Sequence, residues 1–207
     1  MSTIARSASD WREFISGCLD FRPEDNVFRV ARAMYTEPDL FDLEMELVFE
    51  KTWIYACHES EIKQTHDFVT MQAGRQPLII TRDGNGALNA IVNACAHRGA
   101  TLTRVSAGHQ STFVCPFHAW TFRSDGKLLK VKAPSEYAEG FDISERNLKK
   151  ARVESYKGFV FVNLDNEGTT SLEEHLGDAK VFFDLMVAQS PTGELEVLPG
   201  KGHYTHA

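Results

Sequence analysis

The hydrophobic pattern of the chain changes its period near Trp53. Before that residue, apolar side chains recur every three to four positions, as in helices with one buried face. This spacing predicts a short helix over residues 11–18 and a longer one over 36–50, where Pro38 suits the first helical turn. After Trp53, apolar and polar positions alternate, which predicts antiparallel β-structure.

The alternating region contains segments that we expect to be strands, separated by turn signals. The main segments are residues 67–71, 77–81, 88–92, 111–114, 127–131 and 157–164. Asp83-Gly-Asn-Gly86 and Asp125-Gly126 favour tight hairpin turns. A last helix is expected over residues 171–189, because Ser171-Leu-Glu-Glu174 has the sequence of a capping box.

Two short stretches combine cysteine and histidine. The first is Cys95-x-His97, and the second, after seventeen further residues, is Cys115-x-x-His118. Each stretch offers one thiolate and one imidazole. A [2Fe–2S] cluster of the Rieske kind needs this set, since two histidines replace two cysteines on one of its irons. We expect both stretches at the tips of neighbouring hairpins, where these four residues would bind the cluster.

Two other interpretations of these cysteines and histidines remain. A structural zinc site also uses two cysteines and two histidines, but it usually pairs like residues along the chain. A chance scatter is conceivable in a chain with four Cys and eight His. It would not explain why Gly99 and Pro116 accompany the ligands, or why strand-like segments bound both loops.

Composition narrows the cellular setting. The net charge of −7 over 207 residues argues against nucleic acid as a general partner. No apolar run approaches the roughly 18 residues of a membrane span, and the first residues lack the layout of a secretory signal. Cys18 and Cys57 lie outside the motif and are expected to remain reduced and buried. These features predict a cytoplasmic protein that binds no membrane.

At the two loops the sequence resembles a known family. Asn93-Ala-Cys-Ala-His-Arg-Gly99 and Cys115-Pro-Phe-His-Ala-Trp-Thr-Phe122 look like the Rieske motif of aromatic-ring-hydroxylating dioxygenase large (alpha) subunits. His58-Glu-Ser60 and Glu154-Ser-Tyr-Lys-Gly158 are among the stretches similar to the benzoate, toluate, anthranilate and halobenzoate subgroup. The resemblance extends from about Asn26 onward.

The resemblance implies a mainly β fold with flanking helices and three parts. Residues 1–51 would be an N-terminal helical segment, and residues 52–167 a Rieske [2Fe–2S] antiparallel β domain. Residues 168–207 would begin a truncated α+β catalytic domain. Intact members carry a mononuclear iron on two histidines and one aspartate, which we expect beyond Ala207. The chain alone would then contain no catalytic residue and be inactive.

The resemblance also implies a role in electron transfer. A flavin- or ferredoxin-type reductase would reduce the cluster. His118 would be the exit towards the mononuclear iron of a neighbouring alpha subunit, where an aromatic carboxylate such as benzoate or anthranilate is dihydroxylated. A small beta subunit would complete the assembly. The alternative is a stand-alone Rieske-type ferredoxin, although such carriers are commonly shorter and lack the flanking helices.

Several other residues carry more specific expectations. The second loop has Ala119 where the family usually has glycine, which would strain the loop if the position needs a positive φ. Trp120 and Phe122 stand where high-potential respiratory proteins carry Ser and Tyr hydroxyls, so we expect a lower-potential cluster. A structural or solvated role suffices for His58, His66, His109 and His175. His203 and His206 are expected to belong to a strand, with an iron site as the less favoured alternative, because residues three apart on a strand face opposite sides.

A group of cations stands out in this acidic chain. It is either a solvated surface or a docking face for an acidic reductase. Its members are Lys127, Lys130, Lys132, Lys149, Lys150 and Arg152.

Overall fold

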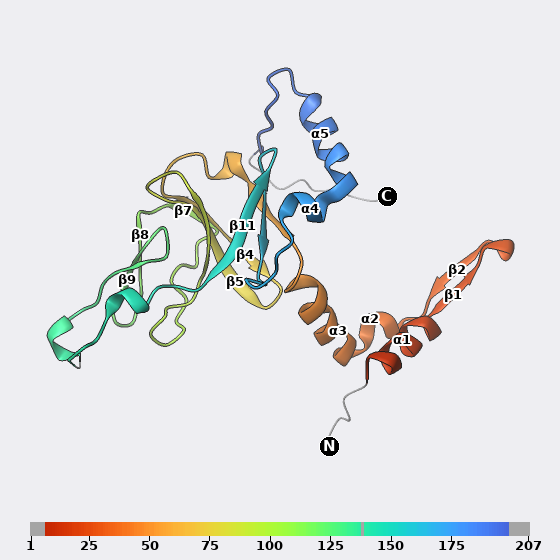
Figure 1. Cartoon of the computed structure of the whole chain (residues 1–207), viewed down its shortest axis with the longest axis horizontal. Coiled ribbons are helices and arrows are strands. Elements are labelled where there is room, and N and C mark those ends of the chain that lie inside the picture. Colours follow the sequence, from red (N-terminus) through yellow and green to blue (C-terminus); the bar gives the residue numbers. More distant parts are fainter. Residues whose placement is uncertain (1–6, 138, 199–207) are drawn as a thin grey trace. The chain divides into compact units, whose positions relative to one another are not determined.

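The computed structural model describes residues 7–137 and 139–198 and separates into two compact units (Figure 1). The first unit ends at Val48 and the second begins at Phe49. We describe each unit by itself. Among the described residues, none of the helices has the length and apolar character needed to cross a membrane.

The first unit combines short helices with a β-hairpin. Its elements are α1 (Ala8–Gly17), β1 (Leu19–Arg22), β2 (Val27–Val30), α2 (Ala33–Thr36) and α3 (Pro38–Glu44), followed by a π-helical turn (Met45–Phe49) whose last residue begins the second unit. Helix α1 confirms the first predicted helix, and a capping box between Ser7 and Asp10 starts it. Pro38 occupies the start of α3, as predicted.

The hairpin corrects the expectation that the first 50 residues are mainly helical. Strands β1 and β2 pair antiparallel from Leu19–Val30 to Arg22–Val27. The turn between them includes Asn26 at φ 54°, a left-handed conformation that asparagine tolerates better than most residues. The signal was present in β1, where the apolar Leu19 and Phe21 alternate with Asp20 and Arg22.

The second unit is built on a seven-stranded antiparallel sheet with the strand order β3-β12-β11-β6-β5-β4-β7. Its strands are β3 (Ile54–His58), β4 (Asp67–Ala73), β5 (Gln76–Arg82), β6 (Leu88–Val92), β7 (Ala107–His109), β11 (Lys150–Tyr156) and β12 (Phe159–Asn163). Four of these strands match predicted segments. Strands β3, β7 and β11 match no predicted segment, although all three lie in the region predicted to be β.

The second unit also contains a three-stranded sheet of order β10-β9-β8, whose strands lie between β7 and β11 in the sequence. Its strands are β8 (Thr112–Val114), β9 (Thr121–Arg123) and β10 (Leu128–Lys130). The turn between β9 and β10 contains Gly126 at φ 83°, as its Asp-Gly sequence indicated. A Cβ at Gly126 would come within 2.8 Å of the Ile91 side chain, so glycine also permits close packing onto β6.

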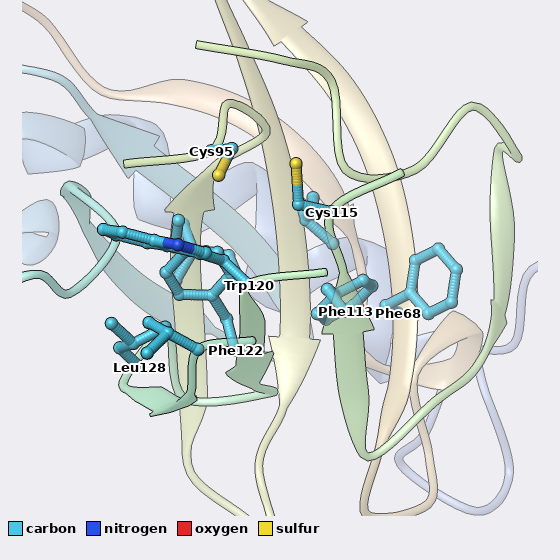
Figure 2. Packing of buried hydrophobic residues seen from close by; sticks show 11 residues of the cluster. Phe68, Cys95, Phe113, Cys115, Trp120, Phe122 and Leu128 are labelled. Carbon is cyan, nitrogen blue, oxygen red and sulfur yellow. The ribbon is translucent and has the colours of Figure 1, made fainter. Parts of the chain in front are cut away.

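Two apolar clusters lie on opposite faces of the central strands. Leu78 and Ile80 of β5 belong to one cluster and Ile79 to the other, and none of the three is exposed. This division follows from the alternation of side chains along a strand. The cluster that includes Ile79 also holds Cys95 and Cys115 (Figure 2). The two predicted cysteine ligands therefore belong to a buried apolar cluster.

The C-terminal helical region is broken where the sequence predicted one helix. It consists of α4 (Leu172–Leu176), a 3₁₀ turn (Gly177–Ala179) and α5 (Lys180–Ala188). The predicted capping box at Ser171 is confirmed. The break lies at Gly177, whose φ of 47° and ψ of −126° are not helical. Residues 194–198 form no strand, and His203 and His206 lie outside the described residues.

Candidate metal centre

The first ligand loop is a closed turn at the end of β6. The Cys95 N–H donates to the Ala100 carbonyl at 2.8 Å, and the Gly99 N–H donates to the Cys95 carbonyl at 2.8 Å. Gly99 has φ 76°, and no atom would lie within 4 Å of a Cβ placed there. The glycine is therefore required by the backbone conformation and not by lack of space.

Asn93 fastens the base of this first loop. Its side-chain NH₂ donates to the Thr103 carbonyl at 2.8 Å, and its side-chain oxygen accepts from the N–H groups of Leu102 and Thr103 at 3.1 Å each. The residue is only 5% exposed, so all three bonds are shielded from water. Asn93 is part of the first motif, but the spacing of the motif residues did not predict these hydrogen bonds.

The second ligand loop repeats the backbone plan of the first. The Cys115 N–H donates to the Trp120 carbonyl at 2.8 Å, and the Ala119 N–H donates to the Cys115 carbonyl at 3.0 Å. Ala119 takes the place of Gly99 and has φ 54°, so the position does adopt the positive φ that the sequence comparison raised.

Only the second loop is the tip of a hairpin. It connects β8 to β9, which pair directly. The first loop leaves β6, and the chain continues to β7, which pairs with β4 instead. The expectation of two neighbouring hairpins was therefore wrong for the first loop. Its own hydrogen bonds and Asn93, rather than a paired strand, close it.

The loops bring the two cysteines together at the inner side of the site. Cys95 and Cys115 are each 3% exposed and are free thiols within hydrogen-bonding reach of each other (Figure 2). Burial raises the pKa of the Cys95 thiol, and the neighbouring Cys115 raises it further, while the backbone N–H groups of His97 and Arg98 act in the opposite direction. A thiolate pair here therefore needs a cation to balance its charge.

The same loops bring the two histidines together at the outer side. The rings of His97 and His118 lie 4.7 Å apart at an interplanar angle of 77°, and both residues are exposed. Partial loss of hydration lowers the pKa of His97, and the adjacent His118 and Arg98 lower it further. This favours the neutral imidazole, the form that binds a metal.

The residues fit a two-iron cluster. A cavity of about 360 Å³ is lined by all four predicted ligands together with Arg98, Gly99, Ala100 and Phe117. Its sulfur donors pair with each other from opposite loops, and so do its nitrogen donors. Within residues 7–137 and 139–198, no three His, Cys, Asp or Glu residues gather as they would around a single ion. Paired sulfur and paired nitrogen match one iron on two thiolates and one on two imidazoles.

The predicted basic residues do not all serve one surface. Lys127, Lys130 and Lys132 are exposed, as is Lys149. Arg152 instead donates to the carbonyls of Gly168 and Thr170 at 2.7 and 2.8 Å, and its guanidinium lies over the Trp53 ring. Lys150, although exposed, donates to the Asn89 side chain at 2.7 Å. The last two side chains therefore make structural contacts.

Four described histidines lie outside the motif, and one of them, His58, has a buried Nε2 with no hydrogen-bond partner among the described residues. His58 is buried and its Nδ1 accepts from the Ser60 N–H. His66 lies partly buried beside Ser124, and the exposed His109 contacts Asp67. His175 is exposed near the end of α4. These positions agree with the structural or solvated roles expected for them, although His66 is less solvated than expected.

Comparison with known proteins places the chain. The Rieske [2Fe-2S] domain family matches residues 52–157 of the 207, which include both ligand loops. The chain is 67% identical over 203 residues to the anthranilate 1,2-dioxygenase large subunit of Acinetobacter baylyi, and 48% identical over 198 residues to the toluate 1,2-dioxygenase alpha subunit of Pseudomonas putida. These alignments cover 98% and 94% of the chain, but only 43% of either relative.

Solved structures agree with the sequence comparison. The naphthalene 1,2-dioxygenase from Rhodococcus sp., bound to indole, superposes with a TM-score of 0.72 at 36% identity, over 76% of this chain and 36% of that one. The mainly antiparallel fold is thus the one found in Rieske oxygenase alpha subunits. The chain belongs to the Rieske [2Fe-2S] domain family, whose cofactor is a [2Fe–2S] cluster.

Proposed function

We propose that this chain is the electron-transfer portion of an aromatic-ring-hydroxylating dioxygenase alpha subunit. Cys95 and Cys115 would hold one iron of the cluster, and His97 and His118 the other. The observation that carries the proposal is the division of the site into a buried thiol pair and an exposed imidazole pair. When bound, the cluster supplies a one-electron redox couple.

The exposure of the two pairs indicates a direction for electron flow. The thiols lie in the apolar cluster, 3% exposed, whereas both imidazoles face the surface. An electron-transfer partner would approach closest at the imidazole side. The role of electron exit suits His118 better than His97, because the neighbouring Phe117 is 73% exposed and does not bury the His118 ring.

The substrate and the partners are proposed from the relatives. The similar proteins are named for anthranilate and toluate, both aromatic carboxylates, so we infer that the longer protein dihydroxylates an aromatic carboxylate. Because the chain spans about two fifths of those relatives, we place the mononuclear iron and the substrate pocket outside these residues. We also propose a reductase, further alpha subunits and a small beta subunit as partners. A cytoplasmic location stays a prediction.

A domain division follows from the same proposal. We keep residues 1–51 as the N-terminal segment, 52–167 as the Rieske domain and 168–207 as the start of the catalytic domain. The compact unit that begins at Phe49 supports a boundary near the first of these divisions. The family match over residues 52–157 supports the core of the second.

The exposed lysines define the proposed reductase face more narrowly than the sequence did. Lys127, Lys130 and Lys132 stand on or beside the β9–β10 hairpin with their side chains in solvent. Complementary charge on an acidic reductase would speed encounter. The double variant Lys130→Glu/Lys132→Glu should slow reduction by the partner several-fold and flatten its salt dependence. Lys63→Glu, at an exposed lysine outside this group, is the control, and equal rates in both variants would contradict the docking face.

The cluster itself is tested by EPR of the dithionite-reduced protein, with iron, zinc and acid-labile sulfide counted on the same sample. We expect a reduced Rieske signal with equal iron and sulfide. Zinc without sulfide would show a structural metal module instead. Reduction by a reductase followed by electron delivery to soluble acceptors, in a protein complete at this length, would favour a stand-alone ferredoxin.

A further inference from the structure

A buried aromatic side chain stacks on one of the two histidines. The Trp120 indole stacks on the His97 imidazole with ring centres 5.0 Å apart and an interplanar angle of 16°. Trp120 is 3% exposed and belongs to the apolar cluster beneath the loops (Figure 2). The nearly parallel rings restrict His97 to rotations that keep its plane against the indole.

A second segment holds Trp120 in place. The indole N–H donates to the Tyr137 hydroxyl at 2.8 Å. Tyr137 stacks on Phe141 with ring centres 4.4 Å apart, and the Phe141 ring also meets Trp120 edge-on at 6.0 Å. The indole N–H is the only polar group of the tryptophan side chain, so this one bond fixes the rotation of the ring.

The other histidine has no comparable support. Within the described part of the chain, the His118 ring has two aromatic neighbours, His97 and the exposed Phe117, whose ring is tilted by 32° at a distance of 6.4 Å. Phe117 is not part of the apolar cluster, so His118 has no direct stacking contact with a described residue like that between His97 and Trp120. The two imidazoles of the site therefore differ in their aromatic support, although the backbones of their loops are closed by equivalent pairs of hydrogen bonds.

We propose that Trp120 is a positioning residue for His97, and that Tyr137 is the anchor that orients Trp120. His97 is the held ligand of the pair and His118 the adjustable one. This inference rests on the proposed function, since it assigns unequal roles to two ligands of the proposed cluster. It adds residues 137 and 141, which lie outside both ligand motifs.

The competing explanation is that Trp120 only fills the core. In that case its removal would lower stability as the loss of any buried aromatic does, and the cluster would keep its electronic structure. Phe68 provides the matched control, because it is 1% exposed and belongs to the same apolar cluster. The Phe68 ring meets Phe113 edge-on with ring centres 5.2 Å apart, and Phe68 lies outside both ligand loops.

The experiment compares four variants of the full chain with their cluster bound: Trp120→Leu, Trp120→Phe, Tyr137→Phe and Phe68→Leu. We expect Trp120→Leu to shift the g-values of the reduced EPR signal and to release iron to a chelator about tenfold faster than the parent, a typical size for loss of support to a metal ligand. Trp120→Phe retains a flat ring and should restore most of both properties. Tyr137→Phe should give a smaller shift, because only the indole anchor is lost.

A measurement on the metal-free chain separates this inference from the proposed function. In NMR spectra, the ring protons of His97 should be displaced upfield by the stacked indole, and Trp120→Leu should abolish the displacement while those of His118 move less. If the parent forms no reduced Rieske signal, the proposed function fails. If the parent signal forms and Trp120→Leu behaves like Phe68→Leu in g-values and iron release, the positioning role is wrong.

Discussion

The two ligand loops share a backbone plan but are stabilised by different means. In each, the cysteine N–H bonds to a carbonyl five residues on, and the cysteine carbonyl accepts from a residue at positive φ. The first loop has Gly99 at that position and Asn93 at its base. The second has Ala119 and is joined directly to the β8–β9 pair.

This difference shows that one backbone conformation can be held by side-chain hydrogen bonds or by the pairing of the flanking strands. The first loop has no paired strand following it, so its sequence supplies the support through a glycine and a buried amide. The second loop is held between two paired strands, and this strand pairing accommodates an alanine in the left-handed region, at a cost of about 1–2 kcal/mol. Each prediction below tests part of that contrast.

The largest effect is expected from removing one cysteine of either loop. Cys95→Ala and Cys115→Ala should each abolish the cluster, because the remaining thiol cannot hold an iron alone in a buried site. Visible absorbance and sulfide content measure the loss. Cys57→Ala is the control: this thiol is also buried, burial raises its pKa to about 12, and it lies outside the site. A cluster that survives either ligand substitution would contradict the assignment.

The amide at the base of the first loop is expected to have the next largest effect. Asn93→Ala removes three shielded hydrogen bonds and should lower the free energy of unfolding by about 2–3 kcal/mol. Chemical denaturation measures this quantity. Asn85→Ala, in an exposed turn, should change it by less than about 0.5 kcal/mol. Equal effects of the two substitutions would show that the first loop does not depend on its amide.

Reciprocal changes at the positive-φ positions test the backbone comparison directly. Gly99→Ala introduces strain with no steric contact, and should destabilise the chain by about 1 kcal/mol. Ala119→Gly removes the strain and should stabilise it by up to about 1 kcal/mol, partly offset by the greater freedom of glycine in the unfolded chain. Thermal unfolding of both variants gives the two signs, and two changes of the same sign would be evidence against the shared plan.

The smallest effect is expected at the exposed tip of the second loop. Phe117 is 73% exposed, so Phe117→Ala should change the free energy of unfolding by less than about 0.5 kcal/mol and leave the iron content unchanged. Phe113→Ala, at a fully enclosed aromatic four residues earlier, should cost about 3–5 kcal/mol. A large loss at Phe117 would mean that the tip is packed and that the second loop is held from both sides.

The types and spacing of Cys95, His97, Cys115 and His118 were enough to indicate the kind of metal centre. A thiolate and an imidazole in each of two short stretches is a pattern set by the chemistry of the cluster, so it is visible without coordinates. The capping box at Ser171 and the turn at Asp125-Gly126 were equally visible, because they depend on neighbours a few positions apart. Backbone strain at Ala119 could also be suspected from the sequence, since a positive φ favours glycine.

Other features depended on contacts between distant residues. The stacking of Trp120 on His97 and its bond to Tyr137 join three separate positions, and nothing in their local sequence specifies that they meet. The first loop was mistaken for a hairpin tip because strand pairing is decided by the whole sheet. The break at Gly177 also went unrecognised, because a single glycine is often tolerated inside a helix.

The sequence by itself determined the ligand chemistry, the mainly β class and the local turns. Each depends on residue types at short spacing, where covalent geometry leaves few choices. Only the tertiary structure decided that the thiols are buried and the imidazoles exposed, and that Trp120 stacks on His97 but not on His118. Those properties come from burial and packing between segments, which the order of residues along the chain does not display.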